Sequence, residues 1–169
     1  MPYDCGFFFT KSLPTLTAVF ENPNAAYLSA VSNDGIPSPL NIGIENSRRF
    51  RALPVYSVLV AYGRAHLQDI FVRQVLLARA IAEFVKGSEK YELLNAERVE
   101  DVGIVVMFKA TDKAVNERLV ASINGIGRIM VSGTKWAGED ACRIAVSTWK
   151  MDVQRDTQIV REVLEAVAR

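Results

Sequence analysis

The stretch from Ser47 to Gly63, SRRFRALPVYSVLVAYG, carries most of what the sequence says about the fold. A basic cluster of Arg48, Arg49 and Arg51 runs directly into a helix-like segment whose surface is nearly all apolar. A helix that is apolar all round is normally buried on every side. We therefore expect this helix to lie in a core or an interface. The three arginines should sit at its exposed end or on anionic partners, because unpaired charges are costly to bury.

A second helix is predicted to start at Arg64 and to stop at Lys86-Gly87-Ser88. Its inward side chains recur every three or four residues, which is the spacing of one helical face. These positions are Leu67, Ile70, Phe71, Gln74, Leu77, Ala78, Ile81, Phe84 and Val85. Gly63 lies between the two helical segments and indicates a tight turn. The sequence thus predicts a long pair of helices.

After Tyr91 the pattern becomes that of a small antiparallel sheet. Three runs have strand composition: Gly103–Lys109, Arg128–Trp136 and Ala141–Trp149. The last two flank a short turn and predict a hairpin. One helix is expected to begin at Thr111 or Asp112 and to end at Asn124-Gly125, and a last helix to begin at Asp152 or Asp156. This order predicts the α+β class, with helices packed on one face of the sheet.

The N-terminal part of the chain gives two further expectations. Cys5–Thr10, CGFFFT, predicts a β-strand covered on both faces. Its neighbours in a sheet would have to come from elsewhere, so it is an orphan strand here. Residues 22–46 are rich in Pro, Asn, Ser and Gly and predict a long loop. Such loops are usually functional or mobile, although an ordered linker to the next helix is the plainer interpretation.

Composition excludes several classes of protein. The 169 residues suit one domain, and a net charge of +1 gives no nucleic-acid footprint. No apolar run reaches the ~20 residues of a membrane span, and the N-terminus lacks the order of a signal peptide. Cys5 and Cys142 are too far apart in sequence to indicate a disulfide framework or a metal site. Cys142 should be buried and inert, and a cytoplasmic location is expected.

Candidate catalytic residues are three: His66, Asp34 and Glu45. His66 is the only histidine, and its titration range suits acid–base chemistry. Asp34 and Glu45 are loop carboxylates that could act as bases beside a pocket. Each has a plainer interpretation, namely a surface or cap histidine and two solvated carboxylates.

Candidate ligand-binding residues are Arg48, Arg49, Arg51 and Tyr27. Guanidinium groups bind carboxylate or phosphate through two parallel hydrogen bonds, so the arginines could hold an anionic small molecule. Salt bridging at the helix start or at a subunit contact is the alternative. Tyr27 precedes the loop and is interpreted as an anchoring aromatic residue.

Three stretches in the right order resemble one family. SRRFRALPVYSVLVAYG followed by RAHLQDI, the run VNERLVASINGIGRIMVSGTKWAGEDACRIAVSTWKMD, and the N-terminal PYDCGFFFTKS are similar to segments of the group II pyridoxal-phosphate-dependent decarboxylases. These are the aromatic amino acid and glutamate decarboxylases, and the N-terminal stretch resembles fungal members. The resemblance covers nearly the whole chain. It implies the C-terminal part of a fold-type I pyridoxal phosphate (PLP) enzyme, with residues 1–46 from the large domain and crossing loop and residues 47–169 as the small domain.

The resemblance also implies what this chain does not carry. The family's Schiff-base lysine lies a few residues before the segment matching Pro2 to Phe9, and only Met1 stands there. We therefore expect no cofactor to be bound by this chain, although PLP serves the family, which consists of carbon–carbon lyases. Lys11 is the nearest lysine, but it lies on the wrong side of the expected strand. The segment matching the mobile catalytic loop, Ser29 to Asn41, contains no tyrosine.

Three functional hypotheses follow. The first is a truncated, non-catalytic decarboxylase-like protein that forms a homodimer through its exposed apolar helix and Phe-rich segment, or binds a small ligand. The second is a small PLP-independent enzyme of specialised metabolism, promoting cyclisation or condensation in a residual cleft by positioning alone. The third is a fragment of an ordinary amino acid decarboxylase.

Overall fold

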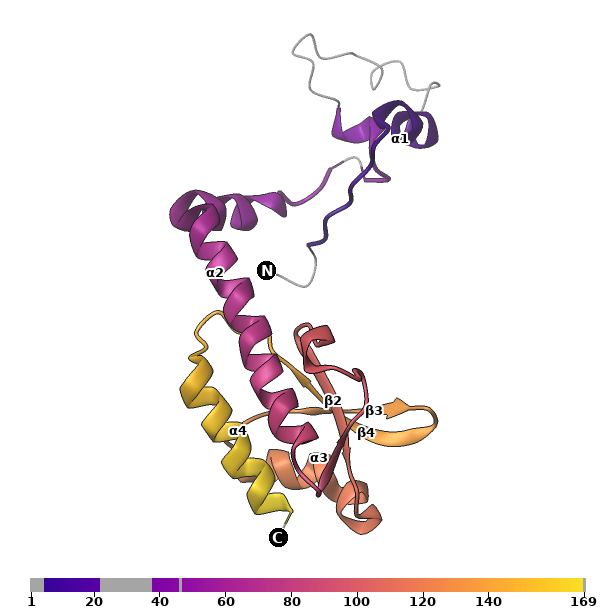
Figure 1. Ribbon diagram of the computed structural model, residues 1–169. Helices are drawn as coiled ribbons and strands as arrows, with labels where there is room; N and C mark the ends of the chain where they lie inside the picture. The colour runs from indigo at the N-terminus through magenta and orange to yellow at the C-terminus, as the bar shows by residue number, and fades with distance from the viewer. Residues whose placement is uncertain (1–4, 22–37, 46, 169) are drawn as a thin grey trace. The chain divides into compact units, whose positions relative to one another are not determined.

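The computed structural model describes residues 5–21, 38–45 and 47–168 (Figure 1). The chain divides into two compact units, Met1–Gly63 and Arg64–Arg169, and each is described by itself. This division falls at the predicted turn. The predicted boundary between residues 46 and 47 concerned ancestry rather than compactness, and it stays a prediction.

The first unit holds two short helices and the first turns of a longer one. Helix α1 spans Leu13–Phe20, and the hydroxyl of Ser12 caps it by accepting a hydrogen bond from the Thr15 N–H at 3.3 Å. A 3₁₀ helix, η1, spans Pro39–Asn41. Its N-cap residue, Ser38, plays the same part through the Leu40 N–H. Ser and Thr at these positions satisfy amide groups that the first helical turn leaves without partners.

The Phe-rich segment differs from its prediction. No β-strand forms among the described residues of Cys5–Thr10. Phe7, Phe8 and Phe9 are 60%, 77% and 87% exposed, so the prediction of a strand covered on both faces is wrong within this chain. The rings of Phe7 and Phe9 stack on each other with centroids 6.2 Å apart. A strand needs neighbouring strands to accept its main-chain bonds, and the described part of this unit supplies none.

Helix α2 spans Ala52–Lys86 and contains the predicted turn. Gly63 adopts φ 71° and ψ 175°, which is not helical and breaks the segment into two helices. This backbone combination is accessible to essentially glycine alone. The prediction of two helices joined at Gly63 is therefore confirmed.

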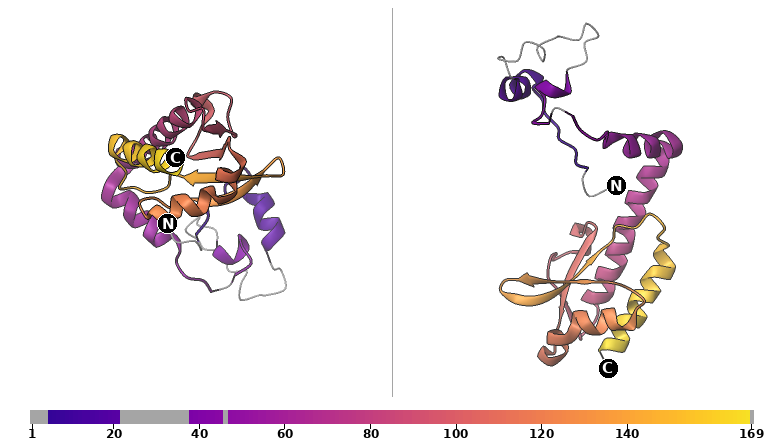
Figure 2. Two further views of the ribbon diagram at one scale, coloured as in Figure 1. Left: turned by 90° about the horizontal axis from the view of Figure 1, so that it is seen from below. Right: turned by 180° about the vertical axis from the view of Figure 1, so that it is seen from behind.

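Four strands form one antiparallel sheet in the second unit (Figures 1 and 2). They are β1 (Tyr91–Leu93), β2 (Val105–Ala110), β3 (Ser132–Trp136) and β4 (Glu139–Ala145), in the spatial order β1-β2-β4-β3. A 3₁₀ helix, η2 (Val99–Asp101), lies between the first two strands. Ala137 and Gly138 have φ of 49° and 88°, so a two-residue turn with left-handed backbone closes the predicted β3–β4 hairpin.

Two helices complete the second unit, α3 (Lys113–Ile126) and α4 (Val153–Val167). Asp112 and Asp152 cap them through side-chain bonds of 2.9 and 2.8 Å, as predicted. Helix α3 does not end at Asn124-Gly125 but continues to Gly127, whose φ is 75°.

The hydrophobic core of the second unit lies on one face of the sheet. Val106, Phe108 and Ala110 alternate on β2 as buried positions, whereas Val105, Met107 and Lys109 are only half-buried. The buried side is covered by residues of α2, α3 and α4, including Ile81, Leu119 and Leu164. The predicted α+β layer with helices on one face is confirmed. On α2 the predicted inward face is correct from Gln74 onwards, but Phe71 is wrong, because it is 62% exposed.

Candidate functional site

The predicted arginine cluster lies in the first unit, just before α2. The Arg51 guanidinium donates through Nη1 to Oε2 of Glu45 at 3.0 Å, and both side chains are partly exposed. The Arg51 N–H donates to the carbonyl of Arg49 at 2.8 Å, and the Arg51 carbonyl accepts from Sγ of Cys5 at 3.6 Å. The structure thus brings Glu45, Cys5 and the start of α2 together around Arg51.

Arg48 lies beside Gly43 in the same unit. A Cβ atom at Gly43 would lie 3.6 Å from Nη1 of Arg48. Arg48 and Arg49 are exposed, as expected for cations at a helix start. Because the carboxylate of Glu45 is already ion-paired with Arg51, the cluster is a mixed-charge contact and not an open set of three cations.

Of the remaining predicted site residues, the structure describes only His66. His66 lies on α2, three residues after Gly63, and is half-buried in the second unit. Asp34 and Tyr27 lie outside the described residues. The roles predicted for all these side chains therefore stay predictions.

The first half of α2 presents an exposed apolar surface. From Phe50, just before the helix, to Tyr62, seven large apolar side chains are between 43% and 67% exposed, and Val55 in the same stretch is half-buried. We call this set the apolar α2 surface: Phe50, Leu53, Tyr56, Val58, Leu59, Val60 and Tyr62. Exposed clusters of this kind normally mark a contact with another molecule or domain. Within the described chain this helix is not buried in a core, so only the interface half of the prediction remains.

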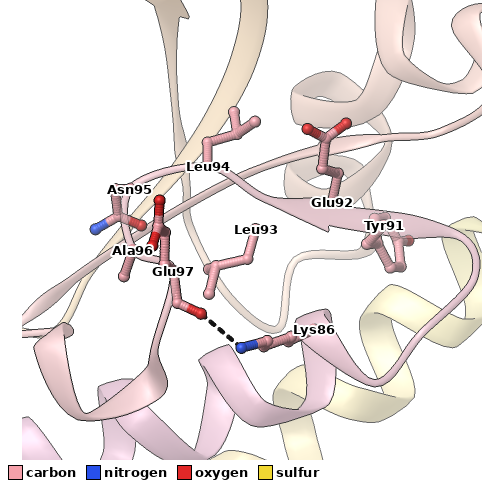
Figure 3. Close-up of a pocket in the computed structure, with 8 residues that line it drawn as sticks. All are labelled: Lys86, Tyr91, Glu92, Leu93, Leu94, Asn95, Ala96 and Glu97. Carbon is pink, nitrogen blue, oxygen red and sulfur yellow. Dashed lines mark hydrogen bonds between the residues drawn. The ribbon is translucent and has the colours of Figure 1, made fainter.

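A groove of about 690 Å³ lies in the second unit, where α2 ends and β1 begins (Figure 3). Its lining is almost contiguous in sequence: Lys86, Tyr91, Glu92, Leu93, Leu94, Asn95, Ala96 and Glu97. Figure 3 shows Leu93 pointing towards Lys86, with Glu92 on the opposite side of the strand. The sequence pattern did not predict this groove, because β1 has only three residues and no recognisable alternation of apolar and polar residues.

Two buried titratable groups lie at or near the groove, the hydroxyl of Tyr91 and the thiol of Cys142. The Tyr91 hydroxyl donates to the carbonyl of Leu164 at 2.7 Å, and its ring meets Phe108 edge-on at 5.5 Å. Burial, with a smaller contribution from Cys142, raises the pKa of Tyr91 to about 12. Burial likewise raises the pKa of the Cys142 thiol to about 12. A thiol that stays protonated is a poor nucleophile, in agreement with the inert role predicted for Cys142.

The described lysines are almost all exposed. A site for PLP needs a lysine that is held beside the cofactor and a partner for the ring nitrogen. Each described lysine is exposed except Lys109, which is half-buried and ion-paired with Glu92 at 3.3 Å and Glu139 at 2.7 Å.

Across residues 5–21, 38–45 and 47–168, no group of three or more His, Cys, Asp or Glu side chains could hold a metal ion. Within those ranges, no helix has the length and apolarity that crossing a membrane requires.

Comparison with known proteins gives the chain its relatives. It is 29% identical over 131 residues to tryptophan decarboxylase TDC1 of Camptotheca acuminata, covering 70% of this chain and 25% of that protein. It is 29% identical over 133 residues to the aromatic-L-amino-acid decarboxylase of Manduca sexta, covering 79% and 25%. A phenylacetaldehyde synthase of Arabidopsis thaliana is 25% identical and covers 95% and 34%. No family model matches the chain.

Solved structures agree on the fold. Oryza sativa TDC, crystallised with PLP and tryptamine, superposes with a TM-score of 0.69 at 21% identity, covering 90% of this chain and 34% of that one. Mouse CSAD superposes with a TM-score of 0.68 at 16% identity, covering 94% and 35%. The fold is thus that of part of a PLP-dependent decarboxylase. The chain is homologous to part of the aromatic amino acid decarboxylases, as the sequence predicted. It spans about a quarter to a third of the length of these relatives.

Proposed function

We propose that this chain is a non-catalytic, decarboxylase-like protein that self-associates through the apolar α2 surface into a homodimer in the cytoplasm. The observation that supports the proposal is the exposure of large apolar side chains along one helix, up to 67% at Val60. At ~25 cal/mol for each Å² of apolar surface removed from water, covering several such side chains is strongly favourable. The arginine cluster lies at the start of the same helix and would contribute charged contacts at the rim of the interface.

The oligomeric state tests this proposal. Sedimentation velocity at micromolar concentration should show a dimer of the 18.7 kDa chain. Replacing both Tyr56 and Val60 by lysine places charges on adjacent turns of the apolar α2 surface, and should weaken the dimer at least about tenfold. Glu117→Lys changes the net charge by the same amount at an exposed position of α3, and should leave the dimer intact. A monomer at micromolar concentration would contradict the proposal.

PLP binding is the second test. Because the described lysines are exposed or ion-paired, none is held beside a cofactor, and we expect titration with PLP to give no saturable aldimine band at equimolar PLP. Borohydride reduction followed by intact mass measurement should give at most a low level of adducts with no single lysine preferred. A stable adduct on one lysine would overturn the non-catalytic assignment, and peptide mapping should examine Lys11 first.

A small PLP-independent enzyme is the second candidate function. Its residual cleft would lie between the loop of residues 22–46 and the long helices. It is distinct from the groove of about 690 Å³ beside β1, whose lining includes none of the predicted acids or bases. Glu45, His66 and Asp34 stay the proposed acids or bases, and Arg48, Arg49 and Arg51 the proposed anion-binding residues. If a substrate is found, unchanged turnover after alanine substitution of each acid or base would exclude that residue.

The third candidate is a segment of a longer amino acid decarboxylase, favoured by the 25–34% coverage of the relatives. Its activity would then be that of a carboxy-lyase, with the cofactor held by residues beyond these 169. The mass of the protein in its own cells distinguishes this candidate from the first. A species well above 18.7 kDa would support the longer enzyme.

A further inference from the structure

The free edge of β1 carries unused main-chain hydrogen-bonding groups. β1 is an outer strand of the sheet, paired with β2 only. The bonds from Leu94 N to Met107 O (2.9 Å) and from Thr111 N to Lys90 O (3.0 Å) fix which residues face β2. Hydrogen-bonded pairs alternate along an antiparallel ladder. The N–H and C=O groups of Tyr91 and Leu93 must therefore point away from β2.

The groove of about 690 Å³ lies along this free edge (Figure 3). None of its lining residues comes from β2; they come from β1, the segment after it and the end of α2. Its shape is fixed by side chains. Lys86 Nζ donates to the carbonyl of Glu97 at 2.6 Å.

Asn95 fixes the other end of the same segment. Its side-chain amide bonds to Val105 O and Met107 N, both at 2.9 Å. The Asn95 side chain makes hydrogen bonds to β2 that the main chain of a longer β1 would otherwise make. The strand therefore ends at this point. The segment after β1 is thereby held at both ends without covering the free edge.

We propose that this groove binds an extended peptide segment of a partner protein, which adds to the sheet as a fifth strand beside β1. Strand addition to a sheet edge obtains its affinity from main-chain hydrogen bonds and its selectivity from alternate side chains. Here Tyr91 and Leu93 offer two donors and two acceptors. This role is independent of the apolar α2 surface, which belongs to the other unit.

The charges of the groove define the incoming strand. Glu92 is 55% exposed on the side of the sheet away from the core, and it shares Lys109 with Glu139. The carboxylate of Glu97, also exposed, has no ion-pair partner among the described residues. A strand that places a lysine or arginine opposite Glu92 would gain an attractive cross-strand pair.

A second copy of this chain does not fit the same edge. Pairing β1 with β1 so that Tyr91 and Leu93 of both copies are bonded would centre the ladder on Glu92. Two glutamates would then face each other directly, which is destabilising. On the other face of the strand, Leu93 and Ala96 offer apolar contacts to the neighbours of the basic residue. The preferred partner segment is therefore extended and alternates apolar and basic residues.

The test uses two blocked pentapeptides, Val-Lys-Val-Lys-Val and Val-Glu-Val-Glu-Val, titrated into the full 169-residue chain. Amide resonances are followed by NMR. The lysine peptide should bind with a dissociation constant of about 10⁻³–10⁻⁴ M, as expected for about four hydrogen bonds. It should shift the amides of Tyr91 and Leu93 and slow their hydrogen exchange. The glutamate peptide should bind at least about tenfold more weakly.

Two variants separate strand addition from non-specific attraction. Leu93→Pro removes a donor that the sheet does not use, and proline is tolerated on edge strands where the N–H faces outwards. It should weaken binding about tenfold. Glu92→Lys should reverse the preference between the two peptides, whereas Glu117→Lys, with the same charge change on α3, should not.

Three outcomes would overturn the proposal. The first is the absence of saturable binding of the lysine peptide at peptide concentrations up to about 5 mM. The second is amide shifts centred away from β1. The third is shifts of Tyr91 and Leu93 that grow with protein concentration without peptide, because they would assign the edge to a second copy. If Leu93→Pro fails to fold, the reversal of preference by Glu92→Lys decides the question alone.

Discussion

Phe108→Ala should remove ~3–5 kcal/mol from the free energy of unfolding of the second unit. Phe108 is fully buried at the centre of β2, paired in register with Cys142 on β4 and Leu93 on β1. Its ring meets Tyr91 edge-on, an arrangement that contributes ~0.5–1.5 kcal/mol beyond the buried area. Because domains of this size have a total stability of ~5–15 kcal/mol, the variant should be close to unfolding.

Urea denaturation followed by circular dichroism measures this loss. Phe71→Ala is the matched control, since Phe71 is the same residue type but 62% exposed on α2. The control should change stability by no more than ~0.5 kcal/mol. Equal losses for the two variants would contradict the burial of Phe108 and the exposure of Phe71.

Stability should also fall steeply between about pH 9 and pH 12. The pKa of the Cys142 thiol rises from 9.0 to about 12 because the side chain is buried. The unfolded thiol therefore releases its proton first, and each proton released favours the unfolded state. Stability from this group is complete below about pH 9 and is lost as the pH rises to about 12. The difference corresponds to ~4 kcal/mol.

Tyr91 adds to the same loss at the upper end of this range. Its pKa rises from 10.0 to about 12, chiefly through burial, so its contribution is lost between those two values. Cys142→Ala should remove the part of the pH dependence that begins near pH 9 and leave the Tyr91 part that begins near pH 10.

Urea midpoints measured from pH 7 to pH 12 test this prediction. A wild-type curve that is flat up to pH 11 would contradict the assigned burial of Cys142. A Cys142→Ala variant that follows the wild-type curve would show that other groups cause the alkaline loss.

Much of the second unit could be predicted because its signals are local. The alternation of buried and half-buried residues on β2 and the helix caps at Asp112 and Asp152 each depend on a few neighbouring residues. The turn glycine Gly63 is equally visible, since only glycine adopts its backbone angles easily. Such features depend little on distant contacts, so the sequence indicates them correctly.

The missed features depend on distant partners. β1 has three residues and exists only because β2 lies beside it. Asn124 was expected to end α3, but its amide instead bonds both the N–H and the carbonyl of Val131 at 2.8 and 3.0 Å. Helix propensity cannot reveal such a bond. The exposed Phe-rich segment is the opposite of β1. It has the composition of a strand, but no strand of the described residues lies beside it, so it forms none.

The candidate site was only partly visible for the same reason. The proximity of Glu45 and Arg51 follows from their separation by six positions and from a helix start. Nothing in the sequence places His66 with either of them, and the groove at β1 has no motif at all. The strand addition proposed there would use main-chain groups of Tyr91 and Leu93, and every residue except proline carries the same main-chain groups.

Mutations before and after Gly63 should have different effects on the folded protein. Every residue of the hydrophobic core lies between Leu77 and Leu164, and no described residue before Gly63 is buried. Substitutions before Gly63 therefore replace no member of the hydrophobic core. Natural variation before Gly63 should follow whatever partner the exposed surface contacts, while variation after it must preserve a folded domain. Rapid change of binding preference and slow change of fold can thus coexist in one chain.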